Sequence, residues 1–79
     1  MNLTLLGPAQ KTVYSILWLE VETSLGNFVI QEGHAPILLI LKPNTDILIS
    51  LTNGHSERIG IPGGILEVTR TDALLLLNE

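Results

Sequence analysis

The sequence predicts an all-β fold of two packed layers, a β-sandwich or flattened barrel of about eight to ten short antiparallel strands. Turn-forming residues recur about every ten residues along the 79-residue chain, a spacing typical of sandwiches and barrels. No segment shows the apolar period of an amphipathic helix. Apolar residues make up 46% of the chain, yet it holds one Trp, one Tyr and one Phe. The core must therefore be aliphatic, which suits strands.

The first half of the chain contains four expected strands. Residues 2–6 form the first, which Gly7-Pro8 ends. The second, over residues 11–22, has an alternating set that begins apolar and ends with Glu20 and Glu22, so we expect it to enter or leave the packed layer part-way along. A turn at residues 24–26 precedes a short strand at 28–31. After Pro36, which cannot donate to a ladder, the apolar run at residues 37–41 is expected to be a strand covered on both faces.

The second half contains two expected hairpins. After a turn at residues 42–45, where Asn44 is expected to take the left-handed conformation, strands are expected at 47–52 and 56–61. Asn53-Gly54 joins them and predicts a type I′ turn, with positive φ at both residues. Residues 62–64 break the pattern, and strands at 65–69 and 73–77 form the last hairpin.

Composition excludes several classes of protein. A chain of 79 residues without Cys is one domain at most, with no disulfide, thiolate catalysis or cysteine zinc site. Its net charge is −4 and its four cations are scattered, so nucleic-acid binding is not expected. The apolar stretch at residues 35–41 is far shorter than the roughly 18–20 residues that span a bilayer, and the N-terminus lacks the pattern of a signal peptide. A cytoplasmic protein is the expectation.

No constellation of residues predicts catalysis, a metal site or a cofactor. His55 follows the Asn-Gly pair and is expected to be a solvated tip. His34 has two open interpretations: it hydrogen-bonds backbone near Pro36, or it contacts a partner. Glu20 and Glu22 share a strand face, which is usually solvated outer surface rather than an acid–base pair.

One string is specific: Gly26-Asn27-Phe28-Val29-Ile30-Gln31-Glu32-Gly33-His34-Ala35-Pro36, followed by Ile37-Leu38-Leu39. It resembles the signature of the epsilon subunits of F-type ATP synthases (delta in mitochondria), with Val29 where the family commonly has Gly. Residues 41–43 and 61–68 resemble further family strings in the same order and spacing, with Asn44 in place of Gly and Pro62 in place of Ser. The resemblance runs the whole length of the chain.

The resemblance implies a non-catalytic central-stalk subunit of a proton- or sodium-translocating ATP synthase. Such a subunit binds the gamma subunit and rests on the c-ring. It is one copy within a hetero-oligomeric complex, peripheral on the cytoplasmic face of the inner or plasma membrane. By the same resemblance Asn27 and Phe28 lie near the c-ring, whereas Glu32, Gly33, His34 and Pro36 face gamma.

Residues 1–79 are expected to be the sandwich domain alone. Most family members continue into two C-terminal helices that restrain ATP hydrolysis, so we expect no helix-based inhibition from this chain. Two alternatives stay open, since fold alone does not settle function. One is a free-standing protein-binding module with a regulatory role. The other is a small-molecule-binding enzyme accessory, which would need a polar-lined pocket.

Overall fold

The computed structural model describes residues 1–78, and within them eight strands and no helix. In chain order the strands are β1 (Asn2–Gly7), β2 (Gln10–Thr23), β3 (Gly26–Gln31), β4 (Ile37–Leu41), β5 (Thr45–Leu51), β6 (Ser56–Ile61), β7 (Gly64–Val68) and β8 (Asp72–Leu77). The predicted all-β class is confirmed. The strand bounds lie within two residues of those expected from the sequence. Glu79, the expected boundary of the sandwich, lies outside the described residues.

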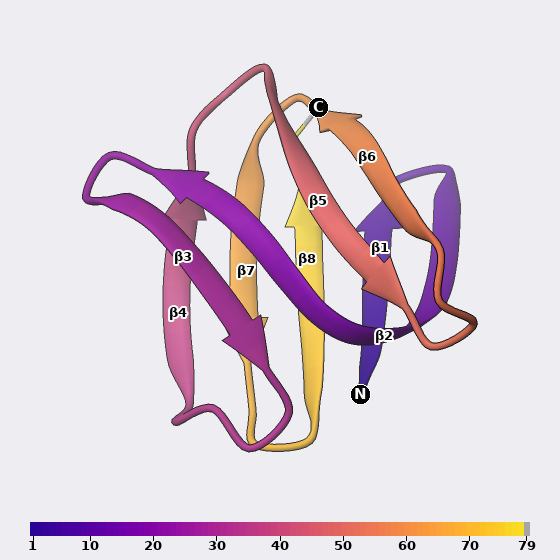
Figure 1. Ribbon diagram of the computed structural model, residues 1–79. Helices are drawn as coiled ribbons and strands as arrows, with labels where there is room; N and C mark the ends of the chain where they lie inside the picture. The colour runs from indigo at the N-terminus through magenta and orange to yellow at the C-terminus, as the bar shows by residue number, and fades with distance from the viewer. Residues whose placement is uncertain (79) are drawn as a thin grey trace.

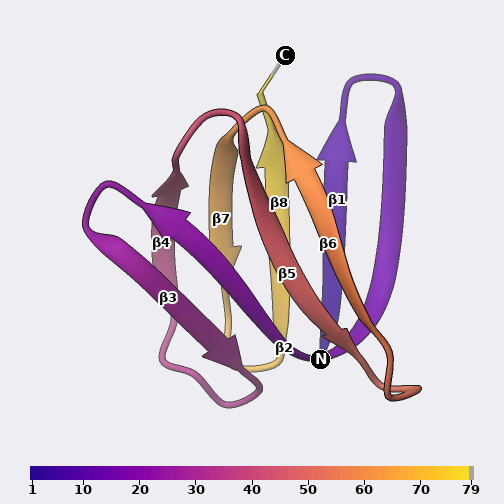
Figure 2. The same ribbon diagram turned by 45° about the horizontal axis from the view of Figure 1, so that its top comes forward.

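The strands form two layers that share β2 (Figures 1 and 2). The β8 layer runs β4-β7-β8-β1 and continues into the first half of β2, whereas the β5 layer runs β3, the second half of β2, β5 and β6. One pairing departs from the antiparallel arrangement that we expected: β1 and β8 are parallel. The short turn at residues 8–9 makes β1 antiparallel to β2. The other edge of β1 pairs with β8, which runs in the same direction as β1.

Aliphatic side chains from both layers fill the space between them, as the composition predicts. The fully buried large side chains are Leu3, Ile16, Leu19, Val21, Ile30, Ile47, Ile49, Leu66, Val68 and Leu75. Tyr14 and Phe28 are partly buried and pack against this cluster. The inner faces interdigitate as expected for two sheets packed face to face.

A bulge in β2 passes the strand from one layer to the other. The pairing with β5 shifts between Ile16 and Trp18, so that Leu17 is an extra residue. Ile16 is buried before the bulge, and Leu19 and Val21 are buried after it, whereas Leu17 is exposed. A bulge bends a strand and changes which side chains point inward. The prediction that this strand enters or leaves the packed layer part-way along agrees with this bulge, although the passage into the second layer was not predicted.

Two turn predictions have opposite outcomes. Asn44 has φ of 55°, so the left-handed turn is confirmed. At Asn53-Gly54 only the glycine has positive φ, at 93°, and the type I′ prediction is wrong. The Asn53 side chain accepts a hydrogen bond from the His55 N–H at 2.9 Å, and the Leu51 N–H donates to the His55 carbonyl at 2.7 Å. This side-chain turn makes the connection longer than two residues.

The prediction that β4 is covered on both faces is wrong. Leu39 and Leu41 point into the core, but Leu38 and Ile40 are 65% and 74% exposed. β4 pairs along its length with β7 and touches β2 only at Thr23–Leu41. Only the inner face of the β8 layer packs against the second layer, so the other side of this apolar strand meets solvent.

Substitution of Gly64 tests the close approach of β7 to β8. A Cβ at this position would collide with the Leu76 carbonyl oxygen, which the ladder holds in place. We expect Gly64→Ala to lower the free energy of unfolding by about 2 kcal/mol or more, measured by urea denaturation. Gly60→Ala is the control, because its Cβ would meet only the movable Asp46 side chain at 3.3 Å. Equal losses for the two variants would contradict the close approach.

Substitution of Thr23 tests the buried turn between β2 and β3. Its hydroxyl donates to the Gly26 carbonyl at 2.9 Å and accepts from the Leu25 N–H at 3.0 Å, and the residue is buried. Thr23→Val keeps the shape but removes both hydrogen bonds of the buried hydroxyl, so we expect a loss of about 1–3 kcal/mol in unfolding free energy. Thr23→Ser keeps the hydroxyl and should lose less. A Val variant as stable as the Ser variant would show that the hydroxyl contributes nothing.

Candidate functional site

The outer face of the β8 layer carries an apolar row that crosses four strands. The registers place Ile40 beside Ile65, Ile65 beside Leu76, and Leu76 beside Leu6. Their exposed fractions run from 37% at Leu6 to 74% at Ile40. Exposed aliphatic residues are ordinary when they are scattered, but a contiguous row marks an interaction surface. We call these four residues the outer apolar row.

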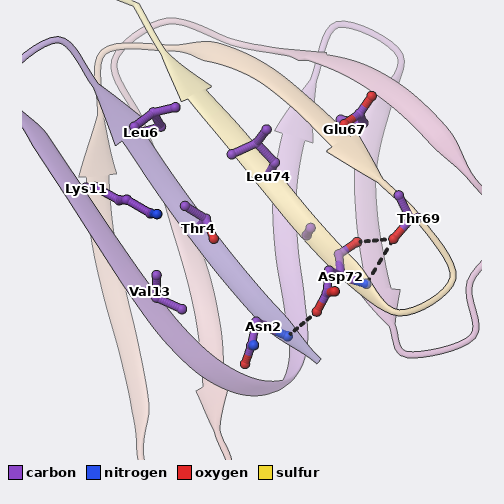
Figure 3. A pocket seen from close by; sticks show the side chains of 10 residues that line it. Asn2, Thr4, Leu6, Lys11, Val13, Glu67, Thr69, Asp72 and Leu74 are labelled. Carbon is purple, nitrogen blue, oxygen red and sulfur yellow. Dashed lines mark hydrogen bonds between the residues drawn. The ribbon is translucent and has the colours of Figure 1, made fainter.

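A second row of residues runs beside the outer apolar row and lines a shallow groove (Figure 3). In this row Glu67 of β7 lies opposite Leu74 of β8, Leu74 opposite Thr4 of β1, and Thr4 opposite Val13 of β2. Leu6 and Leu74 stand at the upper side of the groove, and Lys11 and Glu67 lie at opposite ends of it. Asp72 closes the lower side, where its Oδ1 accepts the Asn2 N–H at 3.1 Å. The groove is open to solvent and lined by both polar and apolar residues, so it does not enclose a small molecule.

The outer face of the β5 layer is more polar, although it includes Val29, which is 49% exposed. The Asn27 amide donates to Glu22 Oε1 at 2.7 Å and to Glu20 Oε2 at 3.1 Å. Arg58 lies 4.0 Å from Asp46 on the same face. The sequence interpretation of Glu20 and Glu22 as outer-face residues agrees with this arrangement, although the pair is partly buried.

The six predicted interface residues fall into two groups. Asn27 and Phe28 lie at the start of β3, whereas Glu32, Gly33, His34 and Pro36 follow its end. At about 3.3 Å per residue of strand, Asn27 and Glu32 are roughly 16 Å apart. The structure therefore does not bring the six residues into one site, which agrees with their assignment to two partners. Their roles as contacts stay predictions.

The loop after β3 is anchored to the β8 layer. The Gly33 N–H donates to the Arg70 carbonyl at 2.8 Å, in the turn between β7 and β8, and Gly33 has φ of 86°. His34 Nδ1 lies 2.7 Å from the Ala35 carbonyl oxygen, the local backbone contact that one of its two interpretations expected. Glu32 Oε1 lies 3.3 Å from the Met1 ammonium group. His55 is exposed at its tip, as predicted.

Sequence reasoning did not locate the residues of the outer apolar row. The available signal was the unbroken run in β4, together with apolar residues at both alternate positions of β8. The run in β4 was interpreted as a strand covered on both faces, whereas its outward positions Leu38 and Ile40 are exposed. Among residues 1–78 no group of three metal-ligating side chains converges. The described part of the chain also contains no helix long and apolar enough to cross a membrane.

Comparison with known proteins identifies the fold independently. Residues 4–79 match the family described as ATP synthase, Delta/Epsilon chain, beta-sandwich domain. A chain of the Tetrahymena thermophila mitochondrial ATP synthase central stalk/c-ring structure superposes with a TM-score of 0.82 at 19% identity. A chain of the Euglena gracilis mitochondrial ATP synthase OSCP/F1/c-ring structure superposes with a TM-score of 0.85 at 18% identity.

The two structural relatives are longer than this protein. The alignment covers 100% of this chain and 63% of the Tetrahymena chain, and 98% of this chain and 49% of the Euglena chain. The likeness at this identity is one of fold, and the family match spans nearly every residue. The chain belongs to the family of ATP synthase delta/epsilon beta-sandwich domains.

Proposed function

We propose that this protein is a non-catalytic central-stalk subunit of an F-type ATP synthase. It binds the gamma subunit and rests on the c-ring, peripheral to the membrane, and it couples proton or sodium flow to ATP synthesis without a cofactor. The observation that carries the proposal is the outer apolar row, exposed on a domain of this family. A surface of this kind calls for a protein partner and not for a substrate.

The difference in polarity between the two outer faces supports the binding of a single large partner to one of them. The β5 layer presents carboxylates, an amide and an arginine, which water solvates well. The β8 layer presents Ile40, Ile65, Leu76 and Leu6 in a line, with Leu38 beside them. Burying such side chains gains about 25 cal/mol for each Å² of apolar surface removed from water. We therefore assign the β8 layer to gamma.

The loop at residues 32–36 extends this gamma-facing surface. The bond between the Gly33 N–H and the Arg70 carbonyl fixes the loop at the end of the β8 layer. Pro36 leads directly into β4, the strand with the most exposed member of the row. Glu32 and His34 therefore add polar contacts at the rim of an apolar surface, the usual composition of a protein interface.

The hairpin between β2 and β3 is assigned to the c-ring. Leu25 at its tip is 86% exposed, and Asn27 follows it. The Asn27 amide is held between two carboxylates, so the hairpin is negatively charged although residue 27 is neutral. A negatively charged tip favours a basic or amide-rich ring loop.

The mechanism is mechanical and involves no covalent step. Torque passes through the sandwich only if the body does not deform, and the shared strand β2 ties both layers together by backbone hydrogen bonds. The outer face of the β8 layer binds gamma, while the β2–β3 hairpin binds the c-ring. Binding free energy at the two surfaces couples their rotation.

The first test is affinity purification of the tagged full-length chain from membranes of its own cells, with the captured proteins identified by mass. Recovery of gamma together with the subunits of the catalytic head is the expected result. A chain recovered from the soluble fraction without them would overturn the stalk assignment. The free-standing regulatory module would then be the better interpretation.

Substitution of Leu76 tests the gamma-facing surface. Leu76 lies in the outer apolar row and is 45% exposed, and Val29 lies on the outer face of the other layer and is 49% exposed. We expect Leu76→Gln to weaken binding to purified gamma about tenfold, because a buried apolar contact is lost. Val29→Gln is the matched control and should bind like the parent. Equal affinities for all three proteins would remove the β8 layer from the gamma interface.

Substitutions in the loop test its polar contacts. Glu32→Ala and His34→Ala are each titrated against gamma, and we expect each to weaken binding about two- to tenfold, as rim contacts do. His55→Ala is the control, since that histidine lies in the distant loop between β5 and β6. Unchanged affinity in both loop variants would exclude Glu32 and His34 from the interface.

A further inference from the structure

The outer face of the β8 layer has a cation and an anion on opposite sides of its apolar centre. Lys11 lies opposite Leu6 at one end of the outer apolar row, and Glu67 lies opposite Leu74 in the next row. Both charged residues are exposed and take no part in an ion pair within the described residues. Three strand spacings of about 4.8 Å and one step of about 6.7 Å along a strand put their Cα atoms roughly 16 Å apart.

We propose that two free copies of this chain pair face to face through this surface. The inference rests on the proposed function only in that gamma and the second copy use the same face. A two-fold axis in the plane of contact, midway between Lys11 and Glu67, brings each Lys11 to the Glu67 of the other copy. One charge of each sign is enough for two ion pairs, because an isologous interface uses every contact twice.

The same axis matches the apolar side chains. On the ladder defined by the registers, it passes beside Leu76 and places that residue close to its own copy. Leu74 then lies over the hollow between Leu6 and Thr4 of the other copy. Figure 3 shows this hollow with Leu6 and Leu74 at one side of the groove and Thr4 in the middle. The central apolar residues of the face therefore match those of the second copy, as the two charges do.

The two kinds of contact have separate roles in this pairing. Burial of the aliphatic side chains provides the affinity, whereas exposed ion pairs contribute little but fix the register. The face is one sheet wide, so the pairing is weaker than an obligate interface. The free subunit thus covers the centre of its apolar surface, around Leu76, Leu74 and Leu6, and releases it when a larger partner competes for the same face.

The test is sedimentation velocity of the purified full-length chain alone, from about 5 to about 500 µM. We expect a monomer–dimer equilibrium with a dissociation constant of about 10–100 µM, as for a small interface. K11E and E67K each place like charges opposite one another twice in the dimer, and each should weaken pairing roughly tenfold or more. The double variant K11E/E67K exchanges the charges and should restore the dissociation constant to within about threefold.

A matched control separates this effect from a change in net charge. E57K alters an exposed residue of β6 in the other layer, and it should leave the dimer as it is. Circular dichroism melts check that all four variants fold. A monomer at every concentration, a dimer indifferent to K11E and E67K, or a double variant that stays weak would each overturn the proposal.

The outcome is independent of the stalk assignment, since the solution contains no other protein. A chain that captures gamma but stays monomeric keeps the proposed function and loses the dimer. A chain that dimerises with the expected charge dependence but captures no gamma keeps the dimer and loses the stalk assignment. The two failures are therefore distinguishable.

Discussion

The rest of the structure depends on β2, the one strand that belongs to both layers. Its first half pairs with β1, and its second half pairs with β3 and β5 after the bulge at Leu17. Its far end meets β4 through the pairing of Thr23 with Leu41, and the Lys42 N–H donates to the Glu22 carbonyl. Backbone hydrogen bonds therefore tie the layers at both ends of β2, in addition to the apolar packing between them.

This arrangement leaves the two outer faces free to differ. A small sandwich needs only one face of each sheet to build its core, so nothing in the folding of this chain requires apolar residues at Leu38, Ile40 or Leu76. Their presence costs solubility and contributes no core packing. The outer face of the β5 layer instead carries the Glu20–Asn27–Glu22 cluster and the Arg58–Asp46 pair.

The candidate interaction sites of this protein lie on its outer surfaces. Three regions of the surface are candidate contacts: the outer face of the β8 layer, the loop at residues 32–36, and the hairpin that holds Asn27. The first two meet at the Gly33–Arg70 hydrogen bond, and the third lies at the opposite end of β3. Under the proposed function, these regions are separate sites for two partners.

The sequence alone determined the fold class, the strand order along the chain and the strand bounds to within two residues, because turn residues and strand periodicity are local properties. It also indicated that β2 enters or leaves the packed layer part-way along, and the string from Gly26 to Pro36 indicated the family. The exposed sides of β4 and β8 were decided by the tertiary structure. An unbroken apolar run has the same sequence whether its outer side is covered or bare, and only the assembled sheet shows which side meets the second layer. The prediction of a type I′ turn at Asn53-Gly54 was wrong because the Asn53 side chain accepts a hydrogen bond from the His55 N–H, and the pair does not adopt its usual backbone geometry.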